Sequence, residues 1–150
     1  LFQKIREEHG LTYTVYSYTS AYVDSGLFCI YAGMNPNQTE KVVSLVCEEI
    51  RDLKKNKISQ SLIDVTKEQM IRNFIIGKES TVNLMTASGA SVLLRGFVQE
   101  TEEILHQIQK ITAEDIQQVI EKILIREDMS ISVVGNLKNI SFQKILENNF

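Results

Sequence analysis

The order of β-favouring and helical segments is the feature that most limits how this chain can fold. Two β-rich runs, at residues 11–22 and 27–34, are separated by a turn sequence at residues 24–26. Mostly helical patterns follow up to about Arg126, and a third β-favouring run occupies residues 129–134. Because helices and strands are segregated along the chain, we predict an α+β fold, an antiparallel sheet with a helical layer, in which the third run joins the first two.

The first two runs have the composition of an antiparallel hairpin. Residues 11–22 alternate Tyr and Thr with Val and Ser, which is typical of a strand. Residues 27–34 carry apolar side chains on both faces, with Leu27 on one and Phe28 on the other. This pattern predicts a second strand that is covered on both sides or central in its sheet.

Capping signals divide the remaining sequence into helices. Gly10 should end a helix over residues 1–9, and Gly96 should end another over residues 80–94. Either Ser59 or Ser61 can cap the helix that carries Leu62, Val65, Met70 and Phe74. Further helices are expected along the stripe from Val42 to Leu53, at residues 101–109, after the capping box Thr112–Asp115, and at residues 141–146.

Composition places the chain among ordinary globular domains. Its 150 residues are 43% hydrophobic and 23% charged, so we expect a single domain over residues 1–150. A net charge of −3 argues against nucleic acid as a partner. The sequence lacks an apolar run of the ~20 residues that a membrane span needs, so no membrane partner is expected.

Residue patterns that could carry chemistry are incomplete in this chain. His9 and His106 each lack a second His at helical spacing, so no zincin motif is formed. Cys29 and Cys47 lie in apolar segments, so we expect both to be small buried hydrophobic residues. A single disulfide between them is the alternative interpretation. There is neither a Gly-rich phosphate loop nor a G-x-S-x-G motif. The residues alone therefore predict an α+β domain with no complete active site and no metal site.

The segment Ile-Arg-Glu-Glu-His-Gly-Leu-Thr-Tyr at residues 5–13 is the most informative motif. It resembles the signature of the C-terminal half of zinc metallopeptidases of the pitrilysin/insulinase family, which includes the mitochondrial processing peptidase. The family's Arg-to-Tyr spacing matches Arg6 and Tyr13. The order of hairpin, helical block and closing strand also fits, so the resemblance covers nearly all of the chain. Since the sequence opens without Met and within a helical pattern, we expect a fragment truncated at its N-terminus.

The resemblance implies a division of labour between two similar halves that close like a clamshell on an extended peptide. The N-terminal half, absent here, would supply zinc and the glutamate that activates water. Arg6 would donate hydrogen bonds to a substrate carbonyl, and Tyr13 would place its hydroxyl near the scissile carbonyl. The implied partners are the peptide substrate and the N-terminal catalytic half or a partner subunit, and this chain alone should be inactive.

Other interpretations of the same residues stay open. Arg6 can be a salt-bridged helix residue and Tyr13 one more strand aromatic. The chain can also be a noncatalytic peptide-binding or assembly subunit of the same fold. Its Lys-, Ile- and Asn-rich composition favours a bacterial cytoplasmic protein.

Overall fold

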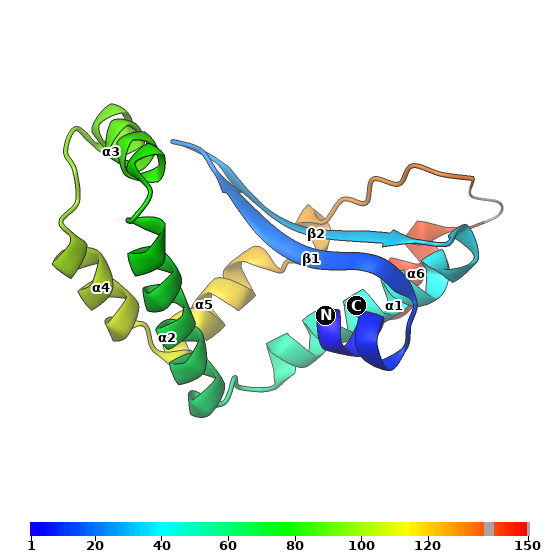
Figure 1. The fold of residues 1–150 in the computed structure, drawn as a ribbon. Coiled ribbons are helices and arrows are strands. Elements are labelled where there is room, and N and C mark those ends of the chain that lie inside the picture. The colour runs from blue at the N-terminus through cyan, green and yellow to red at the C-terminus, as the bar shows by residue number, and fades with distance from the viewer. Residues whose placement is uncertain (137–139, 150) are drawn as a thin grey trace. The chain divides into compact units, whose positions relative to one another are not determined.

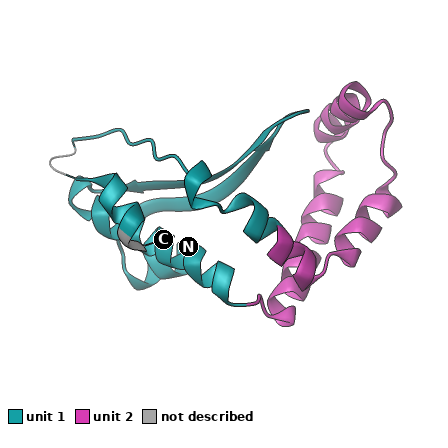
Figure 2. Cartoon of the chain, turned by 180° about the vertical axis from the view of Figure 1, so that it is seen from behind, with its two compact units in different colours: residues 1–56, 119–150 teal, residues 57–118 magenta. Residues whose placement is uncertain are grey.

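The computed structural model describes residues 1–136 and 140–149. Two compact units form, one from residues 1–56 and 119–150 and the other from residues 57–118 (Figure 2). The elements labelled in Figure 1 are β1 (Thr12–Ala21), β2 (Gly26–Met34), α1 (Thr39–Lys55), α2 (Gln60–Gly77), α3 (Thr81–Arg95), α4 (Thr101–Lys110), α5 (Ala113–Ile123) and α6 (Phe142–Asn149). The remaining elements are a π-helix over Phe2–Glu8 and 3-10 turns at Pro36–Gln38 and Arg126–Asp128. Two antiparallel strands together with these helices confirm the predicted α+β class.

The antiparallel hairpin of β1 and β2 is the framework of the first unit. Val15 lies opposite Ala32, and Tyr16 lies opposite Tyr31. The turn is closed by a hydrogen bond of 2.8 Å that the Tyr22 amide donates to the Ser25 carbonyl. Helix α1 packs against one face of this hairpin, and α6 packs against α1 (Figure 1). The core of the unit is the buried cluster of Ile5, Val15, Val42 and Leu45.

The prediction of a third strand is wrong for this structure. In the described part of the chain the sheet has only β1 and β2, and residues 129–134 are irregular. Their apolar side chains find little cover, since Ile131 and Val133 are exposed and Val134 is 99% exposed. Strand propensity expresses the fit of a side chain to a half-buried pleated surface, and without that surface the segment gains nothing from pairing.

The expectation that β2 is covered on both faces is also wrong here. Leu27, Phe28 and Tyr31 are all exposed, although they belong to both faces of the strand. Strand β2 therefore carries apolar side chains that the described part of the chain leaves exposed to solvent.

Helix ends in the second unit follow the capping signals. The Ser59 hydroxyl, rather than that of Ser61, accepts a hydrogen bond from the Leu62 amide at the start of α2. The Ser80 hydroxyl caps α3 in the same way, and Gly96 ends it in the left-handed conformation with φ of 86°. These boundaries therefore coincide with caps formed by residues within one helical turn.

A reciprocal capping box starts α5. The Asp115 carboxylate accepts hydrogen bonds from the Thr112 hydroxyl at 2.7 Å and the Thr112 amide at 2.8 Å, and the Asp115 amide donates to the Thr112 hydroxyl at 3.2 Å. The bond from the Thr112 side chain, followed by that from its amide, lowers the pKa of Asp115. Deprotonated Asp115 therefore stabilises the folded chain above the usual pKa of Asp. That stability is lost as the pH falls through the lowered pKa.

We predict a pH-dependent cost for Asp115→Asn. The variant should unfold at lower urea concentration than the wild type near about pH 7, and the difference should shrink at an acid pH below the lowered pKa of Asp115, where the wild-type carboxyl is protonated too. Urea titrations followed by circular dichroism at both pH values measure this. A difference that is equal at the two pH values would show that the charge of Asp115 is unimportant.

Candidate functional site

Arg6 and Tyr13 lie on either side of a tight connection from the π-helix (Phe2–Glu8), called the first helix below, into β1. Gly10 takes the left-handed conformation with φ of 61°, which favours glycine and turns the chain back. The Gly10 amide donates to the Arg6 carbonyl and the Leu11 amide to the Ile5 carbonyl, both at 3.1 Å. These bonds satisfy carbonyls at the helix end and fix the direction in which the strand leaves.

Buried apolar and charged contacts fasten this first helix to α1. Ile5 is fully buried in the core of the unit. Next to it, the Lys4 ammonium lies 2.5 Å from a Glu49 carboxylate oxygen and 3.9 Å from one of Asp52. The hydrogen bond to Glu49 raises the pKa of Lys4. Arg6, the residue that follows Ile5, is therefore carried on an anchored backbone.

The Arg6 side chain itself is exposed and makes one aromatic contact. Its guanidinium carbon lies 4.9 Å from the centre of the Phe2 ring, a cation–π geometry. Within residues 1–136 and 140–149, no acidic group lies within ion-pair distance of Arg6. The other interpretation of Arg6, as a helix residue held in a salt bridge, is therefore not supported by the described structure.

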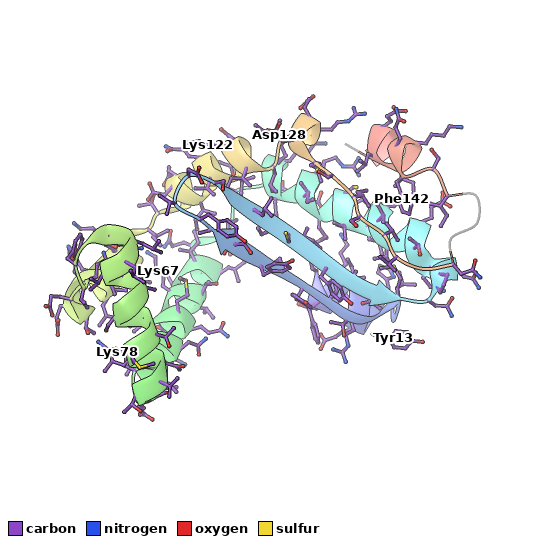
Figure 3. The ribbon with its side chains drawn as sticks, turned by 90° about the horizontal axis from the view of Figure 1, so that it is seen from above. Tyr13, Lys67, Lys78, Lys122, Asp128 and Phe142 are labelled. Atoms are coloured by element: carbon purple, nitrogen blue, oxygen red, sulfur yellow. The ribbon has the colours of Figure 1, made fainter. Side chains whose placement is uncertain are left out.

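Tyr13 occupies an irregularity of the hairpin that the sequence did not reveal. Thr12 pairs with Met34 and Thr14 pairs with Gly33, so Tyr13 is the extra residue of a β-bulge. Its side chain is 75% exposed and points away from the ribbon in Figure 3. Bulges commonly re-aim a side chain, and here the Tyr13 hydroxyl is available for a hydrogen bond from outside the sheet. The one local signal is Gly33 of β2, which pairs with Thr14 beside the bulge, since a glycine inside a strand often marks an irregularity.

The neighbouring Thr12 has an unusual hydroxyl. The residue is 7% exposed, and its Oγ1 has no hydrogen-bond partner among the described residues. A buried hydroxyl without a partner costs about 1–3 kcal/mol. The bulge therefore combines an exposed tyrosine with a locally unsatisfied polar group. The structure brings Arg6 and Tyr13 to the same helix–strand connection, and no direct bond between their side chains occurs in the described part.

A tyrosine cluster on the hairpin was also not recognised as a unit from the sequence. The ring of Tyr16 lies 5.1 Å from that of Tyr31, its cross-strand partner, and 5.9 Å from that of Tyr18. A hydrogen bond with the Cys29 thiol raises the pKa of Tyr18. Both cysteines are free, with Cys47 buried, so the disulfide alternative is not realised. The alternation of Tyr16 and Tyr18 was the available signal for this exposed aromatic face.

The side chains that the structure describes form no cluster that could hold a zinc ion. Across residues 1–136 and 140–149, no three His, Cys, Asp or Glu side chains come close enough to hold a metal. His9 and His106 are both exposed and belong to different units. Separately, no helix in the described part of the chain has the length and apolar character needed to cross a membrane.

Comparisons with known proteins support the resemblance. Residues 1–70, which contain Arg6 and Tyr13, match the family described as the Peptidase M16 inactive domain. The chain is 35% identical to an uncharacterized zinc protease of Streptomyces coelicolor, over 93% of this chain and 30% of that protein. It is 32% identical to the uncharacterized zinc protease YmxG of Bacillus subtilis, over 93% of this chain and 34% of that protein.

Two solved structures share the fold. A protease from Helicobacter pylori has a TM-score of 0.67 and 22% identity, over 83% of this chain and 30% of that one. A chain of complex III2 from Candida albicans has a TM-score of 0.70 and 18% identity, over 79% of this chain and 28% of that one. At these identities the likeness concerns the fold alone.

The match to the inactive domain and the curated relatives agree on one family. The chain belongs to the M16 peptidase family, and residues 1–70 match its inactive domain, which confirms the resemblance at that level. It spans about a third of the length of the curated relatives it matches.

Proposed function

We propose that this chain is the noncatalytic half of a zinc-dependent endopeptidase, in which it binds an extended peptide and stabilises the scissile carbonyl. The observation that carries the proposal is the exposure of Arg6 and Tyr13 around one rigid connection, within the region that matches the inactive domain. Zinc and the general base would come from an N-terminal half or a partner subunit. A cytoplasmic location stays a prediction.

The chemistry of peptide hydrolysis explains why these two side chains suit the task. Negative charge grows on the carbonyl oxygen when a nucleophile adds, and donors that are already in place stabilise it without reorganising. Arg6 offers several N–H donors in a planar fork. Tyr13 offers one hydroxyl on a bulge. The Gly10 turn and the buried Ile5 hold the backbone that carries both.

A second candidate is a noncatalytic peptide-binding or assembly subunit. It is favoured by the shared fold with a chain of complex III2 from Candida albicans, which is itself part of a complex. The exposed apolar side chains of β2 also suit a role in assembly, since this chain leaves them uncovered.

The two candidates differ in an activity measurement on the longer protein that contains this chain. We expect the longer protein to cleave a quenched fluorescent peptide and to contain zinc. The 150-residue chain alone should neither cleave the peptide nor retain stoichiometric zinc after dialysis. Tight zinc binding by the chain through its own ligands would refute the proposed site, and peptide binding without cleavage by the longer protein would favour the second candidate.

A further inference from the structure

A groove in the second unit is independent of Arg6 and Tyr13. It lies between α2, α3 and α4, has a volume of about 490 Å³, and is lined entirely by residues of that unit. Ligand sites in proteins typically span ~300–1,000 Å³, so the groove has the size of a binding site.

The floor of the groove is apolar and only partly buried. Phe74 of α2, Leu84 and Leu94 of α3, and Ile104 of α4 all line it. Leu84 is 45% exposed and Leu94 is 63% exposed, so the groove offers apolar surface that nothing in this unit covers. Ala87 and Ala90 on the same side of α3 are small enough for another chain to approach closely. An apolar ligand would gain free energy by covering this floor.

Two cations belong to the lining, and no acid does. The Lys78 ammonium donates a hydrogen bond to the Thr101 hydroxyl and lies 5.6 Å from the centre of the Phe74 ring. The Arg95 guanidinium donates to the Gln99 side chain. In the described part of the chain neither cation has an acidic partner within ion-pair distance, and no Asp or Glu lines the groove. The groove therefore carries positive charge that a carboxylate would complement.

Amide and hydroxyl groups complete the lining. Asn83, Ser91 and Gln99 line the groove, but the Asn83 amide already donates to the Gly77 carbonyl, the Ser91 hydroxyl donates to the Phe97 carbonyl, and the Gln99 side chain accepts from Arg95. The side chains of Asn73 and Ser88 also belong to the lining, and neither has a hydrogen-bond partner in the described part of the chain. Such groups can pair with the N–H and C=O groups of a peptide, whereas the chain of a fatty acid would leave them unsatisfied. The absence of acids from the lining disfavours an amino terminus.

We propose that this groove binds the carboxyl-terminal end of an apolar peptide, with the terminal carboxylate held by Lys78 and Arg95. The apolar side chains of the peptide cover Leu84 and Leu94, and its last amides pair with the polar groups of the lining. This goes beyond the proposed function because it assigns a second peptide contact, on different residues and in the other unit, that does not depend on cleavage.

The absence of Trp from the chain makes the test direct, because a Trp in the ligand is then the only indole present. The probe is the peptide acetyl-Leu-Val-Trp-Leu with a free carboxyl terminus, compared with the same peptide as its C-terminal amide. Trp fluorescence is followed while the 150-residue chain is added. We expect the free acid to bind about tenfold more tightly than the amide, because charge-assisted hydrogen bonds to the carboxylate are lost in the amide.

Variants locate the site. Lys78→Gln and Arg95→Gln should each weaken binding of the free acid about fivefold or more and reduce its advantage over the amide. Lys110→Gln, which removes an exposed cation of α4 outside the lining, should leave both affinities unchanged. Tyr13→Phe should also leave them unchanged, which separates this site from the proposed catalytic contact. Circular dichroism confirms that each variant is folded.

Three results would overturn the proposal. The first is equal affinity for the acid and the amide, which would show that the groove does not recognise the carboxylate. The second is an equal loss in Lys110→Gln, which would indicate nonspecific charge attraction. The third is displacement of the peptide by laurate at a lower concentration than by the unlabelled peptide acid acetyl-Leu-Val-Phe-Leu, which would assign the groove to a lipid carboxylate instead.

Discussion

Replacing Tyr13 by Phe in the longer protein is expected to lower kcat/KM for peptide cleavage by about 100- to 1,000-fold, the range seen when one donor to a developing oxyanion is removed. The substitution deletes only a hydroxyl. The side chain is 75% exposed and the residue is the extra one of a bulge, so the fold should be unaffected. The effect should appear in kcat as well as in kcat/KM, because the hydroxyl would act most strongly when charge has developed on the carbonyl.

A matched control uses another tyrosine of the same strand. Tyr16 is 48% exposed and packs on Tyr31, but it lies in the regular part of the hairpin. Tyr16→Phe should leave kcat/KM within about twofold of the wild type, a difference of under about 0.5 kcal/mol. If Tyr13→Phe retains full activity with unchanged fold and zinc content, Tyr13 is a strand residue without a catalytic role. If both variants lose activity equally, the hairpin rather than the Tyr13 hydroxyl is responsible.

The features that the sequence predicted correctly are those decided by neighbouring residues. Gly10 and Gly96 end helices because both adopt positive φ, which glycine tolerates. Thr112 and Asp115 form the predicted capping box because the interaction lies within one helical turn. The hairpin likewise needs only two adjacent strands and the turn between them.

The features that failed depend on groups distant in sequence. Residues 129–134 have strand composition, yet pairing them requires a neighbouring strand edge and apolar cover that the described structure does not provide. The bulge at Tyr13 arises from a one-residue difference in pairing between β1 and β2, which alternation of side chains does not encode. For the same reason, the groove with Lys78 and Arg95 could not be expected, because three helices must pack before those two cations share one lining.

Ile5→Ala should produce the largest loss of stability in the first unit, about 2–5 kcal/mol, which is the usual cost of truncating a buried Ile. Ile5 is fully buried and packs with Val15, Val42 and Leu45, so its removal leaves a cavity where the first helix, the hairpin and α1 meet. Since a domain of this size is stable by only ~5–15 kcal/mol, a large share of the free energy of unfolding would be lost. Urea unfolding followed by circular dichroism measures it.

Leu53→Ala is the control for Ile5→Ala, because Leu53 lies on α1 and is 40% exposed, and its truncation should cost under about 1 kcal/mol. Ile5 also links stability to the proposed function, since it stands between the ion-paired Lys4 and the exposed Arg6. If Ile5 positions the connection that carries Arg6 and Tyr13, the milder variant Ile5→Val should reduce kcat/KM in the longer protein while the chain stays folded. A large loss of stability without any change in the activity of Ile5→Val would show that the core holds the unit together but does not set the geometry of the two donors.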